Sequence, residues 1–134
     1  MEIRAIRGAE IEQARVLLAG IGWAHRVSDP QEFRDLISRS QVALVAVEGG
    51  TVVGFIRALT DGVANGYISM LGVDEAHRRR GIGSALVRTA MGTNREMTWV
   101  LRAQRPGLFS FYERLGFRVS KVAMERVRAS NLAA

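Results

Sequence analysis

The stretch from residue 67 to residue 87 constrains the fold of this chain more than any other. It starts with an apolar, strand-like run, Tyr67 to Val73, continues through a short charged connector, and enters a helical pattern that opens on Gly81-Ile82-Gly83. The first N–H groups of a helix lack internal partners and lie at the positive end of the helix dipole. The stretch therefore predicts a strand, a glycine turn and a helix start suited to binding phosphate.

A second motif lies about thirty residues further along, where residues 111–117 are Phe-Tyr-Glu-Arg-Leu-Gly-Phe. With Arg78-x-x-Gly81-x-Gly83 placed after an apolar strand, the pair of motifs resembles the GNAT superfamily of acetyl-CoA-dependent N-acetyltransferases. The pyrophosphate loop of that superfamily has the pattern Arg/Gln-x-x-Gly-x-Gly/Ala. The resemblance covers roughly residues 40 to 125. It implies the GNAT fold, acyltransferase activity and acetyl-CoA as cofactor.

The resemblance also implies which residues bind acetyl-CoA. Backbone amides of residues 79–84 would bind the pyrophosphate, with the side chains of Arg78 to Arg80 adding positive charge near the phosphates. The backbone of residues 71 and 73 would pair with the pantetheine arm like another strand, and one freed amide near Leu71 would donate to the thioester oxygen. The predicted cofactor-binding residues are Leu71, Gly72, Val73, Arg78, Arg79, Arg80, Gly81, Ile82, Gly83, Ser84 and Tyr112.

Two residues are candidates for proton transfer. The resemblance implies that Tyr112 protonates the departing thiolate, the alternative being that its ring packs and its hydroxyl binds the cofactor. Relatives often place a base on the strand before the glycine turn, but residues 67–73 contain no carboxylate. Asp61, in the turn before that strand, is the nearest acid, although a turn aspartate more often bonds its own backbone. A water chain that includes Ser69, or no base at all, remains open. Many relatives have an asparagine that contacts the cofactor arm at the position of Arg105, so this contact is not expected here.

Acceptor recognition is expected from the N-terminal helices and the hairpin loops. The predicted acceptor-binding residues are Trp23, His25, Phe33 and Asp61, with the rest of the loop to residue 65. The alternative for the aromatic residues is that they fill the core. The sequence has no large acidic patch, which argues against a highly cationic acceptor such as a polyamine. Small amines, amino acids and protein N-termini all remain open.

Length and composition limit the class of protein. The 134 residues, 48% of them hydrophobic and 24% charged, predict a single globular domain over residues 1–134. No apolar run approaches the roughly 20 residues of a membrane span, and the N-terminus lacks a secretory pattern, so we expect a cytoplasmic protein without membrane partners. The absence of cysteine and the presence of only His25 and His77 exclude disulfides and predict no metal site.

The net charge of +6 fits a nucleic acid, an anionic membrane or a polyanionic cofactor. The densest basic cluster, residues 77–80, abuts the glycine turn, which favours the cofactor. No aromatic residues interleave with the cluster to stack on bases. A basic nucleic-acid-binding domain therefore ranks behind an acetyltransferase, as does a non-catalytic acyl-CoA sensor, which the missing carboxylate makes reasonable. A homodimer is expected by analogy with small relatives.

Periodicity predicts the order of the elements. Strand patterns occur in residues 2–7, 41–47, 51–60, 67–73, 97–102 and 117–127, and Glu48-Gly49-Gly50 predicts a tight turn between the second and third of them. Helical patterns occur in residues 9–18, in a segment that Ser28 or Asp29 caps and Pro30 opens, in the residues after Gly81, and from Pro106 to Leu115. Gly116 is expected in the left-handed position after the last of these helices. A meander followed by one crossover predicts an α/β (α+β) mixed sheet of about six to seven strands, mostly antiparallel with one parallel pair, and about four helices. The resemblance to the GNAT superfamily implies that the parallel pair is splayed. Gly72 is expected to be a bulge that supplies the splay, or a point of close approach to the backbone.

Overall fold

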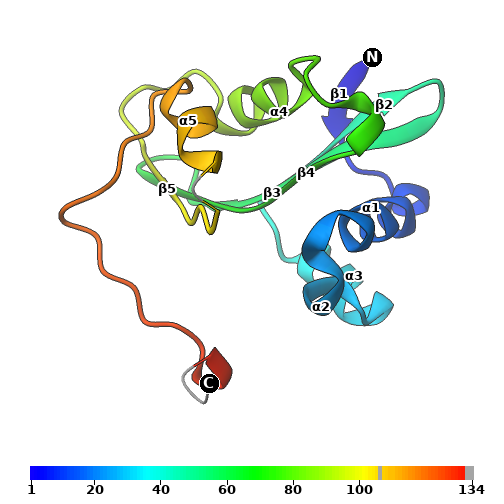
Figure 1. The fold of residues 1–134 in the computed structure, drawn as a ribbon, viewed down its shortest axis with the longest axis horizontal. Coiled ribbons are helices and arrows are strands. Elements are labelled where there is room, and N and C mark those ends of the chain that lie inside the picture. Colours follow the sequence, from blue (N-terminus) through cyan, green and yellow to red (C-terminus); the bar gives the residue numbers. More distant parts are fainter. Residues whose placement is uncertain (106, 132–134) are drawn as a thin grey trace. The chain divides into compact units, whose positions relative to one another are not determined.

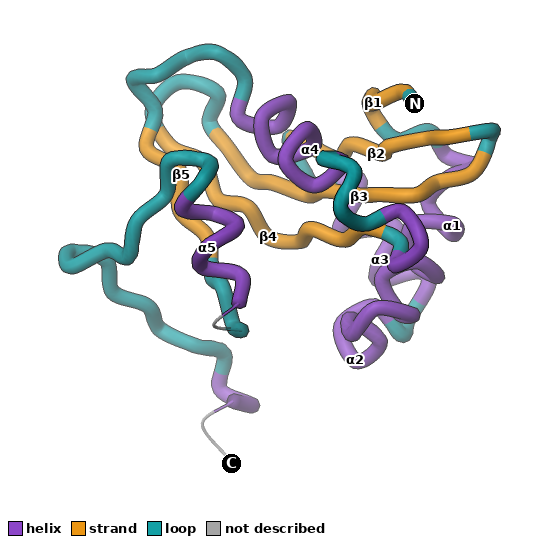
Figure 2. Tube along the Cα trace, turned by 45° about the horizontal axis from the view of Figure 1, so that its top comes forward, coloured by secondary structure: helices purple, strands orange, loops and turns teal. Residues whose placement is uncertain are grey.

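Five strands form one mixed sheet in the computed structural model, which describes residues 1–105 and 107–131. Figure 2 shows them as orange tubes that follow one another in chain order: β1 (Glu2–Ala5), β2 (Val42–Glu48), β3 (Thr51–Thr60), β4 (Asn65–Val73) and β5 (Thr98–Leu101). Neighbours from β1 to β4 are antiparallel, whereas β5 runs parallel to β4. The predicted fold class, a mixed sheet with one parallel pair, is confirmed.

Local turn chemistry sets the central hairpin. Gly49 and Gly50 link β2 to β3 with positive φ values of 58° and 79°. Two consecutive residues in this region match the right-handed twist of the flanking strands, and glycine adopts the conformation without a Cβ clash. The predicted turn after Glu48 is therefore present, and it brings Glu48 opposite Thr51 in the register.

Three helices cover one face of the sheet, and a fourth covers the other (Figure 1). The first group is α1 (Ile11–Leu18), α2 (Ala24–Val27) and α3 (Pro30–Ser38), and the opposite helix is α4 (Ile82–Met91). Asp29 is the N-cap of α3, because its carboxylate accepts from the backbone N–H of Gln31 at 2.9 Å and of Glu32 at 3.3 Å. Asp29 and Pro30 thus start this helix as the sequence predicts.

The core beneath α1 and α3 is apolar. Phe33 of α3 and Phe55 of β3 have ring centroids 6.0 Å apart, and both side chains are buried. Burial of one such ring contributes about 1.5–3 kcal/mol. The buried residues of this cluster are Ala14, Leu18, Val27, Phe33, Ile37, Val45, Val52, Phe55 and Met70. This core anchors the N-terminal helices to the middle of the sheet.

Helix α4 packs closely on the opposite face because β3 has a glycine at the contact. A Cβ on Gly54 would lie 3.0 Å from Leu86 Cδ1, 3.1 Å from Ile82 Cγ2 and 3.3 Å from the Ala46 Cβ. A larger residue would push the helix away from the sheet. Gly54 therefore helps to set the position of the first turn of α4, which contains Ile82.

The irregularity in β4 lies at Ser69, so the expectation of a bulge at Gly72 is wrong. Arg57 pairs with Met70 and Ala58 with Ile68, which leaves Ser69 as the extra residue. Gly72 pairs regularly with Phe55, and its missing side chain makes room for a helix instead. A Cβ there would lie 2.7 Å from Ile21 Cδ1 and 2.9 Å from Leu18 Cδ2. Close approach to the backbone, the alternative expectation for Gly72, is what the structure shows.

The chain divides into two compact units, Met1–Arg102 and Ala103–Ala134, and the sheet belongs entirely to the first. The second contains α5 (Gly107–Glu113), followed by Gly116 with a φ of 96°, the left-handed position predicted after this helix. The predicted helix start at Pro106 lies outside the described residues.

Residues 117–127 do not form the predicted last strand, and the described residues contain five strands rather than six or seven. The segment is irregular and ends in the short 3₁₀ turn Ala129–Asn131. Its apolar residues Val122 and Met124 are 93% and 98% exposed. Alternating residues favour a strand, but a strand also requires a neighbour to bond its N–H and C=O groups, and sequence pattern does not supply one.

Candidate functional site

The turn between β4 and α4 has an unusual backbone. Arg78 is extended, with φ −70° and ψ 162°, whereas Arg79 and Gly81 have positive φ values of 65° and 79°. Arg79 is the one non-glycine residue with positive φ among the described residues. Within that part of the chain, no backbone carbonyl accepts a bond from the N–H groups of Arg79, Arg80 or Gly81. Alternation of this kind turns successive N–H groups into an anion-binding concavity.

The first turn of α4 extends this set of free donors. Its N-cap is Gly81, which offers no side-chain cap, and the first backbone bond runs from Ala85 N–H to the Gly81 carbonyl at 3.0 Å. The N–H groups of Ile82, Gly83 and Ser84 are therefore without intrahelical partners. No acidic residue lies in this turn to neutralise the helix dipole. The structure thus brings the predicted phosphate-binding backbone groups together.

The three arginines of the turn have different surroundings. Arg80 forms an ion pair with Glu48, the last residue of β2, with Nη2 2.9 Å from Oε2. The Arg78 Nε donates to the Val73 carbonyl at 3.3 Å, which ties the turn to the end of β4. The Arg79 side chain is exposed and has no ion pair within the described residues. Positive charge therefore remains at the turn, although Glu48 offsets part of it.

One edge of β4 is open next to this turn. β4 pairs with β5 from Asn65 opposite Thr98 to Ile68 opposite Leu101, and no further pairing follows along β4 in the described chain. The separation begins at the bulged residue Ser69. Residues 69–73 consequently present an edge without a strand partner on this side, and such an edge can pair with another extended group. The predicted pantetheine-binding residues, 71–73, lie on this open edge.

Arg57 of β3 is a buried charged residue near these strands that the sequence pattern alone did not single out. It is 8% exposed, its Nε donates to Ser40 Oγ at 2.7 Å, and its Nη1 donates to Ser69 Oγ at 2.8 Å. Burial lowers the pKa of this guanidinium. The available signal was an arginine inside the otherwise apolar run of residues 52–59. Residues of this type are buried only rarely unless they are paired.

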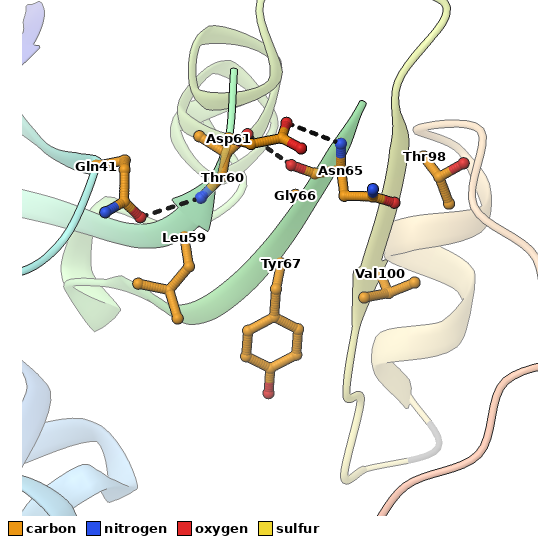
Figure 3. Close-up of a pocket in the computed structure, with 9 residues that line it drawn as sticks. All are labelled: Gln41, Leu59, Thr60, Asp61, Asn65, Gly66, Tyr67, Thr98 and Val100. Atoms are coloured by element: carbon orange, nitrogen blue, oxygen red, sulfur yellow. Dashed lines mark hydrogen bonds between the residues drawn. The ribbon is translucent and has the colours of Figure 1, made fainter. Parts of the chain in front are cut away.

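A pocket of about 470 Å³ opens where β3, β4 and β5 lie side by side (Figure 3). Leu59 pairs with Tyr67, and Tyr67 with Val100, so these three side chains project from the same face of adjacent strands. The complete lining is Gln41, Leu59, Thr60, Asp61, Asn65, Gly66, Tyr67, Thr98 and Val100. The pocket combines an apolar floor with polar groups at its rim, a composition typical of small-molecule sites.

Asp61 lies at this rim, where its carboxylate is engaged by the hairpin. Oδ1 accepts from the backbone N–H groups of Val63, Ala64 and Asn65 at 2.8, 2.8 and 3.1 Å. These backbone hydrogen bonds lower the pKa of Asp61. A carboxylate with a lowered pKa accepts a proton less readily, so the geometry favours the turn-forming alternative over a general base.

Tyr112 belongs to the second unit and is buried in an aromatic cluster. Its ring makes edge-to-face contacts with Phe111 and Phe117, at centroid distances of 4.9 and 5.6 Å. Its side chain is 8% exposed, and burial raises the pKa of its hydroxyl. Tyr112 is therefore protonated at neutral pH.

The predicted acceptor-binding aromatics have different surroundings. Trp23 is half-buried and packs against the core below the sheet, whereas His25 is exposed on α2. Phe33 is 1% exposed and lies in the core, so the core-filling alternative accounts for its place in the structure. Its position one turn into α3, on the stripe that contains Ile37, is the reason for its burial.

The comparisons with known proteins agree with this geometry. Residues 39–119 match the family model described as acetyltransferase (GNAT) domain. No protein with a curated description matches the chain. None of the helices in the described residues has the length and apolar character that crossing a membrane requires.

Solved structures resemble the chain over most of its length. A GNAT family acetyltransferase from Streptococcus pneumoniae is 25% identical, with a TM-score of 0.76 and 96% of each chain covered. Ard1 from Thermoplasma volcanium is 25% identical, with a TM-score of 0.72 over 89% of this chain and 83% of that one. An aminoglycoside 6'-N-acetyltransferase complexed with coenzyme A is 26% identical, with a TM-score of 0.57 over 65% of this chain and 51% of that one. The chain belongs to the GNAT acetyltransferase family.

Proposed function

We propose that this protein transfers an acetyl group from acetyl-CoA directly to a primary amine of a small molecule or of a protein. The observation that supports this most is the set of unpartnered backbone N–H groups from Arg79 to Ser84, next to the open edge of β4. The complex of a structural neighbour with coenzyme A supports the choice of cofactor. The residues present fit that group, since free N–H donors, glycines and arginines meet at one helix start.

The proposed binding roles follow from these positions. The amides of residues 79–84 bind the pyrophosphate, and Arg78 and Arg79 add charge beside it. The open edge of residues 71–73 pairs with the pantetheine arm, and an amide near Leu71 donates to the acetyl oxygen. An oxyanion donor of this kind lowers the barrier by about 3 kcal/mol. Acetyl-CoA, when bound, supplies the acetyl group as a thioester.

The reaction requires two proton movements. The amine nitrogen bonds to the acetyl carbon as the carbon–sulfur bond breaks, one proton leaves the amine, and one proton is delivered to the sulfur. We propose Tyr112 as the donor to sulfur, on the strength of the aromatic motif at residues 111–117. Its raised pKa keeps it protonated before the reaction, and the same shift makes transfer of its proton to a thiolate less favourable than from an ordinary phenol.

The proton of the amine is proposed to leave without Asp61. The three backbone bonds to its Oδ1 and its lowered pKa make it a weak base. Two routes remain: a water chain that includes Ser69 in the bulge of β4, or arrival of the amine in its neutral form. In the second case the rate should follow the neutral fraction of the amine with pH.

The first experiment measures thermal unfolding with acetyl-CoA, coenzyme A and dephospho-coenzyme A. Ligand at one hundred times its dissociation constant adds about 2.7 kcal/mol to the free energy of unfolding. Replacing Arg78, Arg79 and Arg80 together by glutamine should reduce the shift, whereas Arg88→Gln, an exposed arginine further along α4, should leave it unchanged. No shift with any of the three ligands would exclude the proposed cofactor.

Turnover separates an enzyme from an acyl-CoA sensor. Free thiol should appear when acetyl-CoA and a panel of primary amines are added, and Tyr112→Phe should lower kcat while the thermal shift with coenzyme A persists. We expect a loss on the order of 10²-fold or more, the usual contribution of a positioned acid. Cofactor binding without thiol release from any amine would favour the sensor.

A further inference from the structure

Arg57 is a buried cation whose protein partners are hydroxyl groups. Its Nε donates to Ser40 Oγ and its Nη1 to Ser69 Oγ, while the Ser40 hydroxyl in turn donates to the Leu36 carbonyl at 2.6 Å. Within the described residues, no carboxylate lies at ion-pair distance from the guanidinium. A buried charge costs free energy unless an opposite charge compensates it. This guanidinium therefore has no counter-ion among the residues that the structure describes.

The guanidinium also has donors to spare. It carries five N–H groups, of which the two serines occupy two, so three remain and both N–H groups of Nη2 are among them. Among the described residues, the buried side-chain nitrogen that lacks a partner is Trp99 Nε1. Arg57 Nη2 has no protein partner either, but it is not among these buried atoms, so it is in contact with solvent. One end of a buried cation is thus open to a ligand.

The open end lies beside the pocket. Arg57 and Leu59 are two residues apart on β3, so their side chains project from the same face of the sheet. Leu59 and Tyr67 line the pocket, where Figure 3 shows their side chains pointing to the same side. Ser69 of β4, which accepts a hydrogen bond from Arg57, lies at the point where β4 and β5 separate. The cation is therefore close to both the pocket and the open edge of β4.

We propose that Arg57 binds a carboxylate of the acceptor, so that the substrate is a small molecule carrying both a primary amine and a carboxylate, as amino acids do. The proposal rests on the proposed acetyltransferase function. A carboxylate would supply the missing counter-ion and accept two parallel N–H bonds, the geometry in which guanidinium is strongest. A carboxylate held by Arg57 would orient the amine of the same molecule toward the edge of β4. Arg57 would be a substrate-binding residue without a part in proton transfer.

Matched sets of amines test the proposal on the unmodified protein. Each set contains an amino acid, its carboxamide and its decarboxylated amine, with small, aliphatic, aromatic and acidic side chains represented. The measurement is kcat/KM from thiol release, corrected for the neutral fraction of each amine. We expect the carboxylate member of the best set to exceed the other two by about 10- to 100-fold, because charge-assisted bonds contribute at this level. Equal or better activity of the amide or the decarboxylated amine would overturn the proposal.

Variants assign the preference to Arg57. Arg57→Gln should remove the preference for the carboxylate member through a higher KM, with the carboxamide affected little. Arg57→Lys keeps the charge without the planar fork and should give an intermediate preference. The control Arg88→Gln should keep the full preference. A purely structural role in fixing the bulge predicts that all three amines of a set lose activity equally, and that result would also overturn the proposal.

The failures of the two proposals are distinguishable. If coenzyme A shifts thermal unfolding and other amines are acetylated, but none with a carboxylate is, the acetyltransferase stands and the carboxylate site is excluded. If coenzyme A gives no shift, the acetyltransferase fails first. If Arg57→Gln unfolds, the comparison within each set of amines still decides the question with the unmodified protein.

Discussion

Single residues determine whether the turn before α4 can adopt its shape. Gly81 has a φ of 79°, a region where an L side chain costs about 1–2 kcal/mol. Gly81→Ala should lower the free energy of unfolding by about that amount and weaken coenzyme A binding, because relief of the strain moves the amides away from the phosphate. Urea unfolding and the thermal shift measure the two effects. Gly20→Ala is the control, since Gly20 is free of positive φ and a Cβ there meets nothing within 4 Å. Unaltered affinity in Gly81→Ala would contradict a role for this turn.

A second residue, Glu10, should make stability depend on acid pH. Arg4 donates to both Glu10 oxygens, at 2.8 and 2.6 Å, and the Arg7 backbone N–H donates to Oε1 at 2.9 Å. The hydrogen bonds from Arg4 lower the pKa of Glu10 to about 2. A lowered folded-state pKa contributes stability that is complete above the ordinary value of 4.5 and is lost as the pH falls toward 2.

Glu10→Gln tests this dependence. The variant should be less stable than the wild type at neutral pH, and the difference should shrink between about pH 4.5 and pH 2. Urea unfolding at several pH values measures it. Glu12→Gln, which removes an exposed ion pair with Arg15, should change stability little, because solvent screens such pairs. A difference for Glu10→Gln that stays constant with pH would show that the charge is not responsible.

At the scale of elements, the pairing of β4 with β5 depends on an aromatic ring lying over a glycine. A Cβ on Gly66 would lie 2.4 Å from two atoms of the Trp99 ring, and Gly66 and Trp99 are partners in the register. Gly66→Ala should therefore lower the free energy of unfolding by about 1–3 kcal/mol, since a rigid ring cannot yield as a flexible chain end would.

A double-mutant cycle isolates that contact. In a Trp99→Leu background the same Gly66→Ala change should cost less, with a coupling free energy of about 0.5–3 kcal/mol. Thermal or urea unfolding of the four proteins gives the value. Equal costs in the two backgrounds would mean that the ring is not the obstacle, and that the loss comes from the strand backbone.

For the whole molecule, a net charge of +6 is compatible with more than one anionic partner. We expect coenzyme A to bind at the turn of residues 78–81 and to displace any DNA that binds there. Affinity for DNA should be weak at about 0.15 M salt and fall steeply as salt rises, as expected for attraction to phosphates without base contacts. Fluorescence anisotropy of labelled duplex DNA, with and without coenzyme A, measures this. Tight binding that survives saturation with coenzyme A would place the nucleic-acid alternative first.

The features that could be predicted from the sequence are local. The capped start of α3 at Asp29 and Pro30, the Gly49-Gly50 hairpin and the glycine turn before α4 all depend on neighbours within a few residues, and each forms where it was predicted. The family motifs are equally local, so the GNAT fold could be expected from them.

The bulge, the core contacts and the hydrogen bonds of Arg57 could not be predicted in this way, because they depend on residues that are distant in the sequence. The bulge lies at Ser69 because of the register between β3 and β4, and the partner of the Phe33 ring is Phe55, on a strand distant in the sequence. The buried guanidinium of Arg57 donates to Ser40 and Ser69, which lie 17 and 12 residues away in the sequence. The strand pattern of residues 117–127 finds no partner strand among the described residues. A pattern reports what one segment can form, whereas pairing and burial require a second segment in the right place.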